Sequence, residues 1–286
     1  MRKGIVESHS MKKIINITGA CRGCGATFIA VSLAFVMGRY CDGVTYLEGR
    51  AENPGSSPFF ELSLDKHIPE KRFADFSLLK DEGKRADVRV NLYGNVNWAV
   101  KGPKVRGRTE ILPKDVAGRY ILWDSCLWID MLQSGGFSKK TDAAVWDAPE
   151  KNYRPDLILC VIDPLPSRVI ASKRRIEAMK DLPGQNVRWI FNRGSRRDVA
   201  SAEKFLNIRG DFHIPSEPQE KFYEAQRKGT SLADPAGEKN KFFPALEPGA
   251  RQAFDELASY VLTLFLDSFR ASYEAEPITR TTHTLP

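Results

Sequence analysis

Residues 12–34, KKIINITGACRGCGATFIAVSLA, predict a strand, a glycine-containing loop and a helix in immediate succession. The isoleucines at 14, 15 and 17 suit a buried parallel strand. Glycines follow at 19, 23 and 25, and apolar residues then recur at helical spacing from Ala26 to about Arg39. The glycines permit a tight turn and place free N–H groups at a helix N-terminus, where the dipole favours anions. This stretch therefore predicts an α/β fold with a phosphate site.

Two known loops share this pattern. Read as TGxxxGxG, residues 18–25 resemble the dinucleotide loop of short-chain dehydrogenases. Read as CRGCGAT, residues 21–27 resemble the deviant Walker A loop of the MinD/ParA family of P-loop NTPases, KGGxGKT, and the helix continues as it does in that family. In this register Cys21 replaces the signature lysine, and Ala26 replaces the lysine that clamps the phosphates.

The tyrosines argue against the dehydrogenase interpretation. A short-chain dehydrogenase needs a Tyr-x-x-x-Lys pair, because a lysine one helical turn away must acidify the phenol that transfers the proton. None of the eight tyrosines has a lysine four positions later. The dehydrogenase interpretation thus lacks its catalytic pair. An NAD(P)-dependent oxidoreductase that uses the TGxxxGxG loop remains only as the alternative hypothesis.

Later segments resemble the MinD/ParA family in order and spacing. They are Val44–Glu48 (second strand), Tyr120–Asp124 (Walker B strand), Leu157–Pro164 and Val187–Arg193 (later strands), and His213–Pro215 followed by Ala225 and Gly229. The resemblance covers about residues 12 to 265. It implies an α/β fold with a doubly wound, mostly parallel sheet flanked by helices.

The resemblance also implies a site for ATP with Mg²⁺. The residues that would bind the nucleotide are Cys21, Arg22, Gly23, Cys24, Gly25, Ala26, Thr27, Phe28, Asn192, Arg193 and Pro215. Thr27 and Asp124 are the expected Mg²⁺ ligands. Without either lysine the backbone cradle remains but most of the side-chain charge is missing, and Arg22 is a candidate replacement. We expect nucleotide binding with at most slow ATP hydrolysis, in a localisation or assembly scaffold similar to TadZ-type proteins.

Length and composition predict one large globular domain. The chain has 286 residues, of which 42% are hydrophobic and 28% charged. We expect an N-terminal extension at 1–11, a single α/β domain at 12–275 and a disordered tail at 276–286. No apolar run approaches the ~18 residues of a membrane helix, and the N-terminus has no secretory signal, so a cytoplasmic protein is expected.

The segment 58–118 is the least family-like part of the domain. It lies where switch-like loops usually occur in the MinD/ParA family, and we interpret it as an atypical insert at the edge of the sheet. Residues 73–79 suggest a short helix. Residues 88–100 suggest a hairpin that turns at Gly94-Asn95.

The net charge of +7 would suit an anionic partner. The basic clusters are Lys101, Lys104, Arg106 and Arg108 in one segment, and Lys173, Arg174 and Arg175 on a predicted helix. A solvated surface explains the helical cluster about as well as nucleic-acid contact does. The expected partners are therefore a nucleotide, an unidentified protein and a second copy in a homodimer, with nucleic acid or a membrane surface as an unsupported alternative. The helix predicted from about Pro248 to Tyr273 has an apolar stripe and acidic polar residues, which favours core packing over membrane docking.

The five cysteines do not form a disulfide framework, because their number is odd and they are scattered. Cys21-x-x-Cys24 nevertheless has the spacing and position of a redox pair at the start of a helix. No second Cys/His pair at zinc spacing exists, and the chain is far longer than a thioredoxin-like fold needs. From sequence we favour small residues that fill loop positions, and we expect Cys160 in the core.

Overall fold

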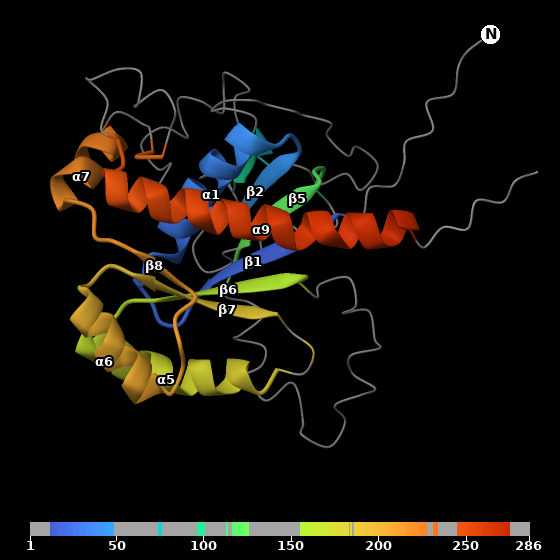
Figure 1. Cartoon of the computed structure of the whole chain (residues 1–286). Coiled ribbons are helices and arrows are strands. Elements are labelled where there is room, and N and C mark those ends of the chain that lie inside the picture. Colours follow the sequence, from blue (N-terminus) through green and yellow to red (C-terminus); the bar gives the residue numbers. More distant parts are fainter. Residues whose placement is uncertain are drawn as a thin grey trace, which may run out of the picture.

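The computed structural model describes residues 12–48, 74–75, 96–100, 113, 116–125, 155–182, 184, 186–227, 231–233 and 245–274. These residues form one sheet with helices on both faces (Figure 1). The strands are β1 (Lys13–Gly19), β2 (Val44–Glu48), β3 (Ala74–Asp75), β4 (Val96–Val100), β5 (Tyr120–Asp124), β6 (Leu157–Ile162), β7 (Val187–Asn192) and β8 (Phe212–Ile214). The helices are α1 (Ala26–Tyr40), α5 (Pro166–Lys180), α6 (Arg196–Leu206), α7 (Gln219–Arg227) and α9 (Pro248–Glu274).

The strand order is β3-β4-β2-β5-β1-β6-β7-β8, and every pairing between neighbours is parallel. The chain first winds from β1 towards β2 and later returns to add β6, β7 and β8 on the other side of β1. The predicted doubly wound α/β fold is therefore confirmed. In such sheets ligands bind outside the carboxyl ends of the strands where the winding reverses, which here is the edge beyond β1.

Strand β1 lies between β5 and β6, so its side chains are buried on both faces of the sheet. Ile15 and Ile17 are fully buried. The one polar residue between them, Asn16, donates from Nδ2 to the carbonyl oxygens of Trp123 at 3.0 Å and Ser125 at 3.1 Å. These bonds tie β1 to the end of β5, so the two strands end at the same edge of the sheet.

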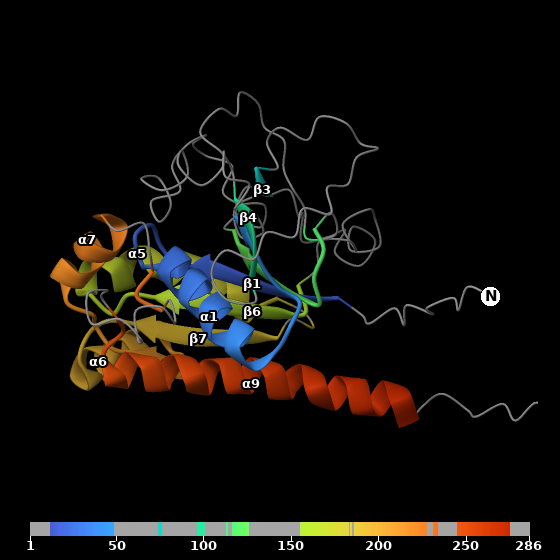
Figure 2. The same ribbon diagram turned by 90° about the horizontal axis from the view of Figure 1, so that it is seen from above.

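Two core layers cover the two faces of the sheet. Helices α1, α7 and α9 pack on one face, and α5 and α6 pack on the other (Figure 1, Figure 2). Strand β6 serves both layers, because Leu157, Leu159 and Val161 face the first and Ile158 and Cys160 face the second. The expected burial of Cys160 is thus confirmed. The period-two alternation of a strand accounts for this division.

Helix α1 has no solvent-facing stripe over most of its length. Every residue from 26 to 38 is buried, because the sheet lies on one side of the helix and α9 on the other. A helix that is apolar on all sides belongs in such an interior position. The loop before α1 is therefore anchored by a helix that is held from both sides.

The insert contributes strands to one edge of the sheet. β4 pairs with β2 and with β3, so these two strands extend the sheet beyond β2. The helix predicted at 73–79 is wrong at 74–75, because these residues pair with the edge of β4 and that pairing outweighs local helix propensity. The second arm of the predicted hairpin forms β4, but its pairings are parallel, and the first arm lies outside the described residues. The predicted extension at 1–11 and the tail at 276–286 also lie outside them.

Helix α9 packs its apolar stripe into the core, as predicted. Phe254, Leu257 and Val261 are fully buried, and Phe265 is 5% exposed. Within the part of the chain that the structure describes, no helix combines the length and apolarity needed to cross a bilayer.

Truncating a side chain of the apolar stripe of α9 should lower the free energy of unfolding. Phe254 is fully buried, and its ring meets that of Phe28 edge-on at 5.6 Å between centroids. We expect Phe254→Ala to lower the free energy of unfolding by about 3–5 kcal/mol, measured by urea denaturation. Leu266→Ala, at a position 52% exposed on the same helix, is the control and should change it by less than about 0.5 kcal/mol. Equal effects would contradict the packing of α9 described here.

Candidate functional site

The loop between β1 and α1 is shaped by three glycines. Gly23 and Gly25 have positive φ angles of 77° and 89°, which side chains disfavour. Gly19 is needed for space, since a Cβ there would lie 2.5 Å from the Cys24 sulfur. Gly25 is also the N-cap of α1 and provides no side-chain cap, and the first turn contains no acidic residue. The backbone N–H groups at the start of α1 therefore suit an external anion.

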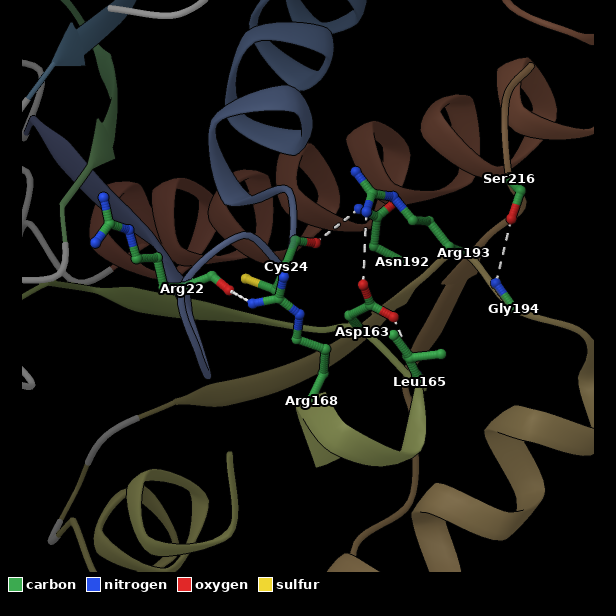
Figure 3. A network of polar contacts seen from close by, with 9 residues as sticks. All are labelled: Arg22, Cys24, Asp163, Leu165, Arg168, Asn192, Arg193, Gly194 and Ser216. Carbon is green, nitrogen blue, oxygen red and sulfur yellow. Dashed lines mark hydrogen bonds and ion pairs between the residues drawn. The ribbon is translucent and has the colours of Figure 1, made fainter. Parts of the chain in front are cut away.

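Asn192, at the end of β7, fixes the loop from the neighbouring part of the sheet. Its side chain is 1% exposed, and Nδ2 donates to the Cys24 carbonyl oxygen at 2.8 Å (Figure 3). A Cβ on Gly25 would lie 2.2 Å from this nitrogen. The resemblance predicts Asn192 among the nucleotide-binding residues, and in this structure its side-chain amide bonds to the backbone of the loop. Its role in this structure is to hold the backbone of the loop.

Two arginines of α5 reach the loop. Arg168 Nη1 donates to the Arg22 carbonyl oxygen, and both Nη atoms lie 3.2 Å from the position of a Cβ on Gly23. Arg175 Nη1 donates to the Gly19 carbonyl oxygen at 2.9 Å. The exposed Arg22 side chain instead points away from Arg168 (Figure 3). Two arginines of α5 therefore add positive charge beside the loop, next to Arg22 of the loop itself.

A second basic group lies on the Asn192 side of the loop. Arg193 Nη1 is 3.5 Å from Asp163 Oδ2, and the backbone of Arg193 is left-handed with a φ of 77°. Its N–H donates to the Ile214 carbonyl oxygen at 2.8 Å, next to the half-buried Pro215. Asp163 is 6% exposed and also accepts from the Leu165 N–H at 3.0 Å. These contacts join the ends of β6, β7 and β8 beside the loop.

The expected metal ligands lie at the same edge of the sheet. The Thr27 hydroxyl is buried and has no hydrogen-bond partner within the described residues. Asp124 ends β5, is 2% exposed, and accepts a hydrogen bond from the Tyr46 hydroxyl at 3.2 Å. A buried, unsatisfied hydroxyl at the start of α1 fits a bound metal or phosphate. Phe28 differs from the other expected ligands, because its ring packs in the core against Phe222 at 5.0 Å between centroids.

Cys21 and Cys24 lie in contact within the loop. The Cys24 thiol donates a hydrogen bond to the Cys21 sulfur, which lowers the pKa of Cys21 to about 6. Ser172 and the positive charge of Arg168 add to this shift, while burial opposes it. The same bond, together with burial, raises the pKa of Cys24. Burial also raises the pKa of Cys41, at the other end of α1. Over the described ranges there is no group of three or more His, Cys, Asp or Glu side chains placed to hold a metal ion.

Sequence reasoning located the loop but missed its contacts with α5. Asp163 was recognised only as the end of a strand, and Arg168 was not singled out. Both follow from one signal: a residue that ends a parallel strand, or begins the helix after it, lies at the edge where ligands bind. The basic cluster on α5 is divided, because Arg175 turns to the loop whereas Lys173 is exposed and lies over the ring of Phe205, 5.4 Å from its centroid.

Solved structures of low sequence identity share this fold. A ParA family ATPase from Chlorobium tepidum is 13% identical with a TM-score of 0.56, over 86% of this chain and 98% of that one. MinD in the MinC:MinD cell division complex of Aquifex aeolicus is 17% identical with a TM-score of 0.54, over 88% and 96%. MinD complexed with Mg-ADP from Pyrococcus horikoshii is 18% identical with a TM-score of 0.51, over 88% and 96%. No protein-family model matches the chain, and no curated protein matches it by sequence.

These similarities show a MinD/ParA-like P-loop NTPase fold that spans most of the chain. The predicted resemblance is confirmed at the level of the fold. The short-chain dehydrogenase alternative is not favoured.

Substitution of glycine by alanine should destabilise the protein at Gly25 but not at Gly249. Gly25→Ala forces alanine into a left-handed backbone and against Asn192, so we expect a loss of at least about 1–2 kcal/mol in the free energy of unfolding. Gly249→Ala is the control. It lies in α9, where the added Cβ would be 3.8 Å from Pro215, an ordinary contact, and alanine suits a helix. Thermal melting of both variants checks this, and a stable Gly25→Ala protein would contradict the described loop.

Proposed function

We propose that this chain is a MinD/ParA-like nucleotide-binding protein that takes ATP with Mg²⁺ at residues 21–27 and acts as a scaffold with weak or no ATPase activity. One observation carries the proposal: an uncapped helix N-terminus, with a buried unsatisfied Thr27 hydroxyl, lies where the winding of the sheet reverses. The Mg-ADP of the Pyrococcus MinD structure supports the same ligand class.

The phosphates would be held mainly by backbone. Gly23, Gly25 and the first turn of α1 direct N–H groups at the site, and this arrangement favours phosphate without any lysine. Arg168 would supply the positive charge that Ala26 cannot. Its guanidinium has five N–H donors, of which one is used by the Arg22 carbonyl oxygen, so donors remain for a phosphate oxygen.

The metal would be held by Thr27 and Asp124. A hydroxyl and a carboxylate are oxygen ligands, and Mg²⁺ in nucleotide sites typically uses one or two protein groups together with phosphates and water. When bound, Mg²⁺ neutralises phosphate charge. Within the protein, Tyr46 positions Asp124 through its hydrogen bond, and Asn192 keeps the loop backbone in place.

Slow or absent hydrolysis follows from the residues at two loop positions. Catalysis of phosphoryl transfer depends on positioning and on neutralising charge as it develops. Ala26 offers only its N–H, and Cys21 has neither the length nor the charge to reach a nucleotide in a second subunit. The Arg168 guanidinium is fixed by its bond to the Arg22 carbonyl oxygen. It can therefore stabilise a bound phosphate, but it is not free to move with the phosphate as charge develops during the reaction. Binding without rapid turnover is suited to a scaffold.

The partners would be proteins that recognise the nucleotide-bound form. The complex of MinD with MinC from Aquifex aeolicus is one assembly built on this fold. A homodimer is the second expected assembly. The proposal includes no nucleic-acid or membrane contact: Arg175 of the α5 cluster is bonded to the loop, and the basic residues at 101–108 lie outside the described residues.

Nucleotide titration tests the proposal directly. We expect Mg·ATP to raise the melting temperature of the full chain more than ATP with a metal chelator does, because Thr27 and Asp124 require the metal. Ala26→Lys should strengthen ATP binding by about tenfold, since a hydrogen bond to a charged group contributes roughly 1.5–3 kcal/mol. Stabilisation by NAD(P)H and not by Mg·ATP would overturn the proposal, as would an absence of any response in both proteins.

Arg168 should supply positive charge that strengthens nucleotide binding. We expect Arg168→Ala to weaken Mg·ATP binding by about tenfold, through the loss of a charge-assisted hydrogen bond. Lys173→Ala is the matched control on the same helix, and it should leave the affinity unchanged because Lys173 is exposed and lies against Phe205. Isothermal titration calorimetry measures both. Equal effects would mean that general surface charge, and not Arg168 at the loop, attracts the nucleotide.

A further inference from the structure

The two cysteines of the loop differ in burial, and such a difference suits a thiol pair that exchanges disulfides. Cys21 is half-buried, with part of its side chain against the core, whereas Cys24 is 2% exposed. The Cys24 sulfur lies over Gly19, at the end of β1, where any side chain larger than hydrogen would displace it. The pair thus has one half-buried member and one buried member.

The surroundings of Cys21 stabilise a thiolate. The Cys24 thiol donates a hydrogen bond to it, Ser172 of α5 contacts it, and the guanidinium of Arg168 adds positive charge. Cys24 comes directly before Gly25, the N-cap of α1, so the pair also lies at the positive end of a helix. Asp163 is the acidic group that opposes these effects. The contacts are those of an activated thiol, which the spacing of the two cysteines alone could not establish.

We propose that Cys21 and Cys24 form a redox-active dithiol whose substrate is a small disulfide, with Cys21 as the attacking sulfur and Cys24 as the resolving one. This activity goes beyond nucleotide binding and does not depend on it. The pKa of Cys21, about 6, supports the assignment, because an attacking thiol works best when its pKa is near the ambient pH.

The exchange balances with the disulfide RSSR as the oxidant. The Cys21 thiolate attacks one sulfur of RSSR, a mixed disulfide forms, and RS⁻ leaves. Cys24 then loses its proton and attacks the Cys21 sulfur, so the intramolecular S–S bond forms and the second RS⁻ leaves. The two leaving thiolates become RSH by taking up two protons, one from Cys24 and one that Cys21 gave to the solvent when it ionised. Two electrons pass from the protein dithiol to RSSR, and a reducing thiol reverses the reaction.

The experiment uses the full chain, without nucleotide, equilibrated with mixtures of reduced and oxidised glutathione and quenched with acid and N-ethylmaleimide. Arg22 lies between the two cysteines. Tryptic cleavage after it therefore separates them unless a disulfide joins the two peptides, and mass spectrometry distinguishes these cases. We expect a Cys21–Cys24 disulfide that forms with rising oxidised glutathione and disappears with dithiothreitol.

Substitutions assign the two roles. Cys24→Ser should accumulate glutathione on Cys21, because no resolving thiol remains, and Cys21→Ser should prevent both glutathionylation and disulfide formation in the loop. Melting curves establish that each variant is folded. A parallel measurement needs no substitution: in the unmodified chain at pH 7, iodoacetamide should alkylate Cys21 at least about tenfold faster than Cys41. Cys41 is also half-buried but lies at the opposite end of α1, where burial raises its pKa.

Two results would overturn the proposal: no glutathione on Cys21 in Cys24→Ser, or equal alkylation of Cys21 and Cys41. Neither result bears on nucleotide binding, which calorimetry measures separately in the reduced protein. A failure to bind ATP would likewise leave the thiol exchange intact.

Discussion

The parallel pairing of β1 with both β5 and β6 is the constraint on which the rest of the structure depends. It brings residues more than a hundred positions apart in the sequence to one edge, as the registers of Ile17 with Asp124 and of Gly19 with Val161 show. Asn16 secures one side of this arrangement through two buried hydrogen bonds. Everything proposed for the loop, from phosphate binding to thiol exchange, requires β1 to end between these two strands.

Much of the positive charge beside the loop comes from other elements. Residues 19–27 contain Arg22 but no lysine, and Arg168 and Arg175 of α5 and Arg193 at the end of β7 lie next to them. Arg168 and Arg175 bond to carbonyl oxygens on two parts of the loop, and Asn192 bonds to a third. These bonds hold the loop by three of its carbonyl groups, so they do not use the N–H groups at the start of α1. The loop thus keeps its shape with Cys21 and Ala26 at two of its positions, because contacts from α5 and β7 hold its backbone.

The sequence predicted the strands that line the site because they are continuous apolar runs that end in polar residues. Val44–Glu48 and Tyr120–Asp124 have the predicted bounds. It failed where tertiary contacts decide the outcome. Residues 74–75 pair at the sheet edge in place of a helical turn. The direction of the Arg22 side chain, away from Arg168, is likewise not visible in the sequence. The start of the helix after β6 indicates that Arg168 lies at the ligand-binding edge, but its contact with residue 22 spans 146 positions and is not visible in a local pattern. The two thiols were visible as a motif, but their unequal burial was not.

The unequal anchoring of the two helices that meet at the loop has a mechanical consequence. Helix α1 is enclosed along most of its length, so displacing it would disturb the sheet and α9 together. Helix α5 buries only Val169, Ser172, Ile176 and Met179, and the rest of its surface faces solvent or is only partly covered. Of the two, α5 has the less resistance to movement, and it carries both arginines that bond to the loop. A displacement of the loop backbone would therefore be taken up more readily by α5 than by α1, which acts as the fixed support.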